Sequence, residues 1–230
     1  MKKSLHFFGG NFNSIQGSPT LGGNLKLPPK VSRLGLLGLL VFTLSTTWAN
    51  TYTVSNTNDA GAGSLRQAII DANANPGADV IDFSTSGLLT LASSLPTITG
   101  QVDIQGQTAT GYVAGAPTFH IHTASGITML TVSGTTGTII NGIDFSSTGG
   151  RTATAISLSN AVDPTVTNCL IKTRELAIQI SNGSNPTIQG NDFTNSGFAN
   201  TSAQLYMNGV TSIATGAVTG NTWGGSTAGT

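Results

Sequence analysis

Few residues of this 230-residue sequence could do chemistry, because Asp, Glu, Lys and Arg together make up only 8% of it. Asp144 and Asp192 occupy the same place in two similar phrases, residues 140–145 and 188–193. Two carboxylates on one face of a fold can act as general acid and base or hold a cation. If the phrases stack two strands apart, strand spacing separates the carboxylates by roughly 10 Å, and we interpret both as solvated, outward-pointing residues.

The densest cluster of charge after residue 49 consists of Lys172, Arg174 and Glu175, on the turn that follows Ile171. With Asp144 or Asp192 from neighbouring strands, this cluster could form a small site for an acidic sugar or calcium, with Arg174 as a candidate base. A solvated turn is the alternative that we favour, because exposed ion pairs of this kind contribute well under ~1 kcal/mol each.

His120 and His122 flank Ile121 and therefore share one face of a predicted strand. Such a pair can bind a transition metal, but no third ligand is recognisable nearby, so we favour an ordinary polar face. Cys169 is the single cysteine, which excludes an intramolecular disulfide, and we predict a buried thiol that fills core space. The sequence has no basic patch for nucleic acid and no phosphate-loop or hydrolase motif.

The elements that must position these residues follow from a recurring phrase of strand, bend and strand. Its third place holds Gly142, Asn168, Gly190 or Gly220, which are the residue types that best tolerate a left-handed backbone. The first and last places are always large and apolar. Residues 104–107 echo the phrase one longer unit earlier, and residues 110–117 are predicted to form an inserted loop.

A second marker keeps step with the bends, since apolar pairs at alternate positions recur every 22 to 27 residues. The pairs are Leu130 and Val132, Ile156 and Leu158, Ile178 and Ile180, and Leu205 and Met207. Periods in this range are typical of solenoids, in which each coil buries its apolar side chains against its neighbours. Alternation in twos and the abundance of Thr, Val and Ile indicate strands rather than helices.

One short helix is predicted before the coils. Ser64 and Gln67 have the spacing of a capping box, and residues 75–77, Asn-Pro-Gly, end the helix. The apolar side chains that share one face of this helix are Leu65, Ala68, Ile69 and Ala72. Because a solenoid exposes its core at its first coil, we interpret this amphipathic helix as a lid on that end.

Residues 64–69, Ser-Leu-Arg-Gln-Ala-Ile, carry an S-L-R-x-A-I signature. The surrounding segment resembles the N-terminal segment that precedes β-helix repeats in many exported and surface-associated bacterial proteins. The coils resemble the β-helix of the pectin lyase-like superfamily. The resemblance implies an all-β fold, a single-stranded right-handed parallel β-helix with a short N-terminal α-helical cap, and the handedness rests on the resemblance alone. Enzymes of that superfamily act on acidic polysaccharides along an exposed face of the helix.

Three regions are expected along the chain. Residues 1–49 are predicted to be a signal peptide with a long basic n-region, cleaved after Ala49, because an apolar run at 34–44 precedes a small-x-small site. Residues 50–79 hold a first strand and the capping helix, and residues 80–230 hold the coils. We expect no membrane span in the mature chain. No second cap follows Trp223, so we expect a truncated chain that continues into further coils or a C-terminal anchor domain.

These features favour an exported, non-catalytic β-helix module of a bacterial surface or secreted protein, adhesin-like or structural. Its expected partner is a polysaccharide or a host or cell-surface glycan, and no cofactor is expected. One alternative is a pectate-lyase-like or glycoside-hydrolase-like enzyme acting on acidic polysaccharide, for which calcium would be a cofactor. The other alternative is an autotransporter passenger. Like the favoured surface or secreted module, it would be extracellular or on the outer cell surface.

Overall fold

The computed structural model describes residues 48–147, 154–172, 176–194 and 203–224. The chain divides into two units, residues 1–45 and 46–230, and only the second contains described residues. Most of the predicted signal peptide, residues 1–47, therefore lies outside the described part. Within the described ranges, no helix is long and apolar enough to cross a membrane.

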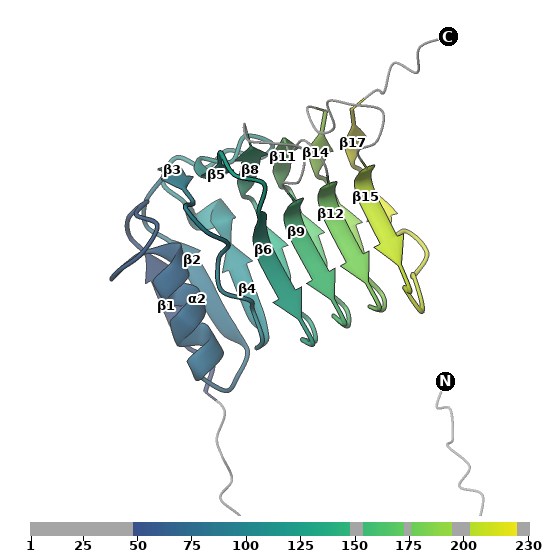
Figure 1. Cartoon of the computed structure of the whole chain (residues 1–230), viewed down its shortest axis with the longest axis horizontal. Helices are drawn as coiled ribbons and strands as arrows, with labels where there is room; N and C mark the ends of the chain where they lie inside the picture. The colour runs from purple at the N-terminus through teal and green to yellow at the C-terminus, as the bar shows by residue number, and fades with distance from the viewer. Residues whose placement is uncertain (1–47, 148–153, 173–175, 195–202, 225–230) are drawn as a thin grey trace, which may run out of the picture. The chain divides into compact units, whose positions relative to one another are not determined.

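The described residues form three parallel sheets (Figure 1). The seven-stranded sheet contains, in order, β1 (Thr51–Val54), β2 (Asp79–Phe83), β4 (Val102–Gln105), β7 (Ile139–Asn141), β10 (Thr165–Thr167), β13 (Thr187–Gln189) and β16 (Val218–Thr219). The six-stranded sheet contains β3 (Gly87–Thr90), β5 (Phe119–Thr123), β8 (Asp144–Ser147), β11 (Leu170–Lys172), β14 (Asp192–Phe193) and β17 (Thr222–Trp223). The four-stranded sheet contains β6 (Thr128–Ser133), β9 (Thr154–Ser159), β12 (Leu176–Ser181) and β15 (Ala203–Asn208).

Successive strands of each sheet come from successive turns of the chain, so the described residues form a parallel β-solenoid of about six turns. The predicted register of the apolar pairs is confirmed in the four-stranded sheet. Leu130 pairs with Ile156, Ile156 pairs with Ile178, and Ile178 pairs with Leu205. Side chains that point inward are buried and their neighbours are not, as in β5, where Phe119, Ile121 and Thr123 are buried.

The predicted bends are also confirmed. Gly142, Asn168, Gly190 and Gly220 have φ angles of 72°, 53°, 64° and 65°, and each lies between a strand of the seven-stranded sheet and one of the six-stranded sheet. Residues 104–107 differ from this pattern, because Gly106 begins a 3₁₀ turn, η1 (Gly106–Thr108), that leads into the inserted loop. A Cβ atom at Gly106 would overlap the carbonyl oxygen of Gly142, so the turn packs closely on the next bend.

Side chains just after the bends stack inside the solenoid. Cys169 and Asn191 are 2% and 1% exposed, as expected for inward-pointing side chains. The Asn191 carboxamide accepts a 3.0 Å hydrogen bond from the backbone nitrogen of Cys169 and donates one of 2.9 Å to the carbonyl oxygen of Val166. Asn221 repeats this arrangement one turn later, since it accepts from the nitrogen of Asn191 and donates to the oxygen of Ile188. The stack therefore joins neighbouring bends where strand pairing is interrupted.

The predicted helix is α2 (Leu65–Ala74), which packs beside β1 and β2 at the N-terminal end of the solenoid (Figure 1). The four predicted apolar residues are its buried residues, and Asn75 is its C-cap. The prediction of a capping box is correct for one of its two hydrogen bonds. The Ser64 hydroxyl accepts from the nitrogen of Gln67, but the Gln67 side chain donates to Asp71 instead of returning to Ser64, whose nitrogen donates to Gly61.

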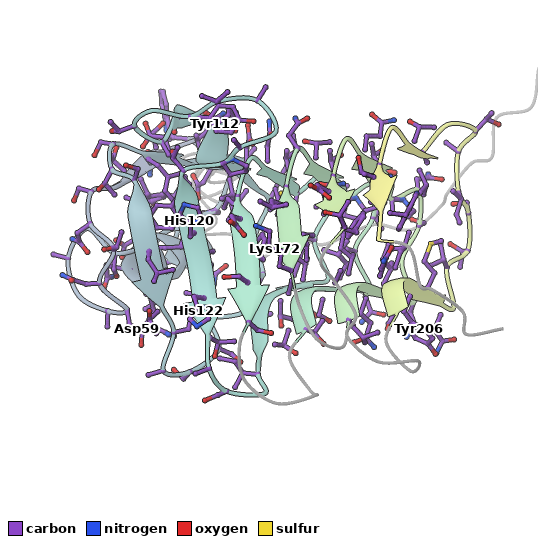
Figure 2. The ribbon with its side chains drawn as sticks, turned by 90° about the horizontal axis from the view of Figure 1, so that it is seen from above. Asp59, Tyr112, His120, His122, Lys172 and Tyr206 are labelled. Carbon is purple, nitrogen blue, oxygen red and sulfur yellow. The ribbon has the colours of Figure 1, made fainter. Side chains whose placement is uncertain are left out.

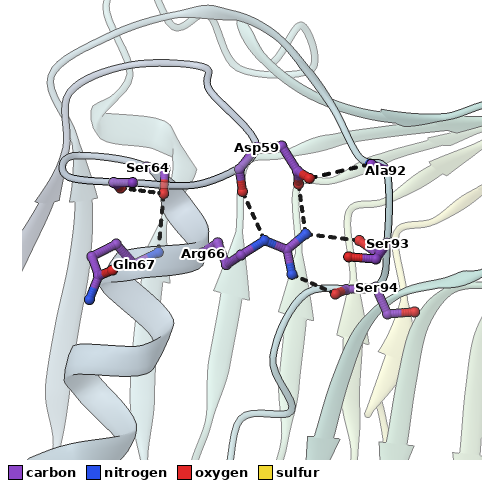
Figure 3. Close-up of polar contacts among 8 residues, drawn as sticks. Asp59, Ser64, Arg66, Gln67, Ala92, Ser93 and Ser94 are labelled. Atoms are coloured by element: carbon purple, nitrogen blue, oxygen red, sulfur yellow. Dashed lines mark hydrogen bonds and ion pairs between the residues drawn. The ribbon is translucent and has the colours of Figure 1, made fainter.

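Arg66, in the middle of the S-L-R-x-A-I segment, joins the helix to two loops (Figure 3). Its guanidinium donates to the backbone oxygen of Asp59, forms a 2.6 Å ion pair with the Asp59 carboxylate, and donates to the backbone oxygens of Ser93 and Ser94. The Asp59 carboxylate also accepts from the nitrogen of Ala92 at 3.4 Å. Arg66 therefore fixes the loop before the helix onto the segment that leads to β4.

Inward-facing side chains of the last described turn are accessible. Trp223 stacks on Phe193, with ring centroids 4.8 Å apart and planes inclined by 13°, yet it is 45% exposed. Met207, which continues the row of Val132, Leu158 and Ile180, is 38% exposed. The core thus reaches solvent at this turn.

Candidate functional site

The outer face of the six-stranded sheet brings together the candidate residues that the structure describes. Strand pairing sets them in two adjacent rows that cross the sheet. The first row is Leu88, His120, Asp144, Leu170, Asp192 and Thr222. The second row is Thr90, His122, Ser146 and Lys172. We call this surface the histidine face; Figure 2 labels His120, His122 and Lys172 on it.

His120 and Asp144 form the closest pair of ionisable side chains on this face. Nδ1 of His120 lies 2.8 Å from Oδ2 of Asp144, on the neighbouring strand. The side chain of Asp144 is only 8% exposed, whereas that of His120 is 38% exposed. When the Asp144 carboxylate is ionised it can only accept a hydrogen bond. Nδ1 of His120 then donates to it, and Nε2 is the proton-accepting atom of a neutral ring.

The expectation that Asp144 is solvated is therefore wrong. Its place on the outer face was predicted correctly, but the carboxylate is covered, and Oδ1 has no hydrogen-bond partner within the described ranges. Asp192 matches its expectation better, since it is only partly buried and accepts a 2.8 Å hydrogen bond from the nitrogen of Thr194. Leu170 separates the two aspartates, so they do not act on one another as a carboxylate pair.

His122 and Lys172 occupy the second row. Nδ1 of His122 lies 3.2 Å from the hydroxyl oxygen of Ser146, which pairs on its other side with Lys172. Lys172 is the last residue of β11 rather than part of a turn, because its strand continues one residue beyond Ile171. Its backbone lies two strands from that of His122, which at strand spacing is about 10 Å. Arg174 and Glu175 lie outside the described residues.

The described residues contain no group of three or more His, Cys, Asp or Glu side chains that could hold a metal ion. One ring nitrogen of His120 is already hydrogen-bonded to Asp144. Two histidines on alternate positions of one strand, one of them paired in this way, do not make a set of metal ligands. The chemistry of the histidine face is that of hydrogen-bond donors and acceptors spaced by strands, with one buried carboxylate behind an accessible imidazole. Such a face can bind polar ligands and can accept a proton at His120.

Sequence analysis missed the contact between His120 and Asp144 because an insertion hides the repeat. Residues 109–118 lie between η1 and β5, so the strand that carries His120 starts 13 residues after Gly106. In later turns the corresponding strand starts two residues after the bend glycine or asparagine. The alternation of Phe119 and Ile121 was the available signal, since Ile121 pairs with Phe145.

Neither the protein-family models nor the curated proteins compared with this chain include a match. The described residues form a parallel β-solenoid with one short α-helix at its N-terminal end, and this architecture is the class that the structure defines.

Proposed function

We propose that the protein is an exported, non-catalytic β-helix module of a bacterial surface or secreted protein, which contacts a polysaccharide through the histidine face. The observation that carries the proposal is the pair of rows on the six-stranded sheet, in which imidazole, hydroxyl, ammonium and carboxylate groups follow one another at strand spacing. A sugar chain presents hydroxyl groups at similarly regular intervals, so weak contacts can repeat along both partners.

Export is supported by the sequence and belongs to the same proposal. The apolar run at 34–44 follows Arg33 and precedes the site after Ala49, which is the order of regions in a signal peptide. The S-L-R-x-A-I segment supports kinship with the exported, right-handed β-helix proteins that it resembles, because in this chain it supplies the helical cap and its anchoring arginine.

Binding is tested with purified residues 50–230 and soluble polysaccharides, one neutral and one containing uronic acid, by isothermal titration calorimetry. The informative variant combines His122→Ala and Lys172→Ala, because both side chains lie on the outer face in the row that does not contain Asp144. Loss of these donors should weaken binding at least tenfold, or about 1.4 kcal/mol.

The matched control combines Thr131→Ala and Gln179→Ala on the outer face of the four-stranded sheet, where both side chains are also partly buried. This control should bind as the unmodified protein does. Absence of binding to either polysaccharide, or equal weakening by the two double variants, would show that the histidine face is not the binding surface.

One observation favours a second candidate, an enzyme that acts on acidic polysaccharide. The buried Asp144 behind the more exposed His120 is an arrangement in which a carboxylate orients an imidazole for general-base catalysis. In a lyase, His120 would remove the proton beside the uronate carboxylate. The test is release of unsaturated products from a polyuronate; turnover that His120→Gln abolishes would replace the non-catalytic proposal with the enzymatic one.

A further inference from the structure

Asp79, the first residue of β2, is a buried carboxylate with one oxygen unused. The residue is only 2% exposed. Its Oδ1 accepts 2.8 Å hydrogen bonds from the backbone nitrogen of Asn50 and from the side-chain amide of Asn75. Its Oδ2 is buried and has no hydrogen-bond partner within the described ranges. A buried carboxylate is stable only when cations or several donors compensate for its lost hydration, and here neutral donors reach one oxygen alone.

One of the two donors to Asp79 is the backbone nitrogen of Asn50, the residue that follows the predicted cleavage site. In the uncut chain this atom is an amide with a single hydrogen and no charge. Signal peptidase would hydrolyse the bond between Ala49 and Asn50, with water supplying the oxygen of the new Ala49 carboxylate. The released amine takes up a proton from solvent and becomes an ammonium group with three N–H donors.

We propose that Asp79 is the acceptor site for this α-ammonium group, so that removal of residues 1–49 converts a neutral hydrogen bond into a buried ion pair. The inference rests on the proposed export and adds a role for the cleavage itself. Only small adjustments are needed, because the Asn50 nitrogen already lies 2.8 Å from Oδ1 of Asp79, and Oδ2 has no hydrogen-bond partner within the described ranges. Charge-assisted hydrogen bonds of this type are about twice as strong as neutral ones.

The surrounding contacts show what the ion pair would hold together. The oxygen of Asn50 accepts a 2.8 Å hydrogen bond from the nitrogen of Val80, and the pairing of β1 with β2 begins at Thr51. Asn75 is the C-cap of α2. The ammonium group would therefore join the first strand, the second strand and the end of the capping helix at one point. Trp48 and Ala49 are exposed, so the residues before the cleaved bond are not part of the core.

The test compares two chains that differ by one residue and makes no use of secretion. Residues 50–230 are released from an N-terminal fusion by a protease that leaves no extra residue, and residues 49–230 are prepared in the same way. Both contain nearly all of the compact unit 46–230. In the longer chain Asn50 again has an amide nitrogen, and the ammonium group moves one residue away from Asp79. We expect the shorter chain to unfold about 3–6 °C higher.

Asp79→Asn in both chains completes the cycle and should reduce the difference between them to about 1 °C or less. Equal melting temperatures of the two unsubstituted chains, or a difference that persists with Asp79→Asn, would overturn the proposal. If Asp79→Asn prevents folding, acylation of the α-amine decides instead, because the paired amine of the shorter chain should react at least tenfold more slowly than the amine of the longer chain. Equal acylation rates would overturn the proposal.

The N-terminus of protein exported from a bacterial host tests the processing step separately. A chain that begins at Asn50 supports the proposal, and one that begins elsewhere overturns it. Neither result depends on glycan binding, since the histidine face is tested with different substitutions. A failure to bind polysaccharide would leave the ammonium site standing.

Discussion

His120 and Asp144 lie on neighbouring strands, β5 and β8, with Nδ1 of the imidazole 2.8 Å from Oδ2 of the carboxylate. Their residue numbers differ by 24, which is about one turn of the solenoid. Because Asp144 is buried and Oδ1 has no partner within the described ranges, His120 is the side chain that compensates for the desolvation of this carboxylate. The pair therefore links the stability of the sheet to the chemistry of its outer face.

Replacement of His120 should expose this dependence. His120→Ala leaves the Asp144 carboxylate buried without its partner, and we expect the free energy of unfolding to fall by about 1–3 kcal/mol. With Asp144→Leu already present, the same replacement should cost less than about 0.5 kcal/mol, because no buried charge remains. Urea denaturation of the four chains measures both values. Equal costs of His120→Ala in the two backgrounds would show that the contact contributes nothing to stability.

Much of the fold could be predicted from the sequence because each turn of a solenoid repeats the same bends and the same buried positions. Gly190 and Gly220 occupy equivalent bends with nearly equal φ angles. Ile178 pairs with Ile156, as the matching spacings of the bends and the apolar pairs predict. Each turn buries the same positions against the next, so a local pattern of side chains carries long-range information. Confirmation of the register in the four-stranded sheet follows from that redundancy.

The histidine face was predictable only in part, because it depends on contacts that the repeat does not encode. Outward alternation gave the correct face for His120 and Asp144, but the sequence did not show that Asp144 is covered. The role of Arg66 in joining the two loops was also missed. Its partners at Ser93 and Ser94 are backbone oxygens, and every residue type has one, so the sequence gives no signal for them. Backbone acceptors and insertions of irregular length leave no periodic signal.

Arg66 should be difficult to replace even with another cation. Arg66→Lys keeps the charge near Asp59 but cannot reproduce the planar set of donors that reaches Asp59, Ser93 and Ser94 together. We expect a loss of about 1–3 kcal/mol in unfolding free energy. Hydrogen exchange should also become faster in residues 55–63 and 91–97. The control is Lys172→Arg, at a partly exposed position, which should change stability by less than about 0.5 kcal/mol.

The stack of side chains after the bends gives predictions for substitutions at two neighbouring turns. Asn191→Ala leaves the nitrogen of Cys169 and the oxygen of Val166 buried and unpaired, which should cost about 2–4 kcal/mol. Cys169→Asn should extend the stack, because the oxygen of Ile140, which corresponds to the Val166 oxygen one turn later, lies 3.9 Å from the Cys169 sulfur; the thiol also lies 3.3 Å from the oxygen of Thr167. Thermal unfolding checks the order, in which Cys169→Asn should be more stable than Cys169→Ala. The reverse order would show that the stack ends at Asn191 for steric reasons.

The Cys169 thiol should make the stability of the protein depend on alkaline pH. Burial raises the pKa of this thiol from its ordinary value of 9.0 to about 12, with a smaller opposing effect from hydrogen bonds of the backbone at Ile143 and Gly142. The unfolded chain therefore releases the thiol proton first as the pH rises. Between pH 9.0 and about 12 the folded state binds more protons than the unfolded state, so stability falls by up to about 1.4 kcal/mol per pH unit.

Cys169→Ala isolates this contribution from tyrosine and lysine titration, because those groups are common to both chains. The difference in unfolding free energy between the two should be constant below pH 9.0 and should change above it, to the disadvantage of the unmodified protein. Alkylation gives an independent check, since a thiol that stays protonated and buried should react with iodoacetamide at pH 8 only after denaturant is added. Rapid alkylation of the native protein would mean that the bend at Asn168 opens and exposes the interior of the solenoid.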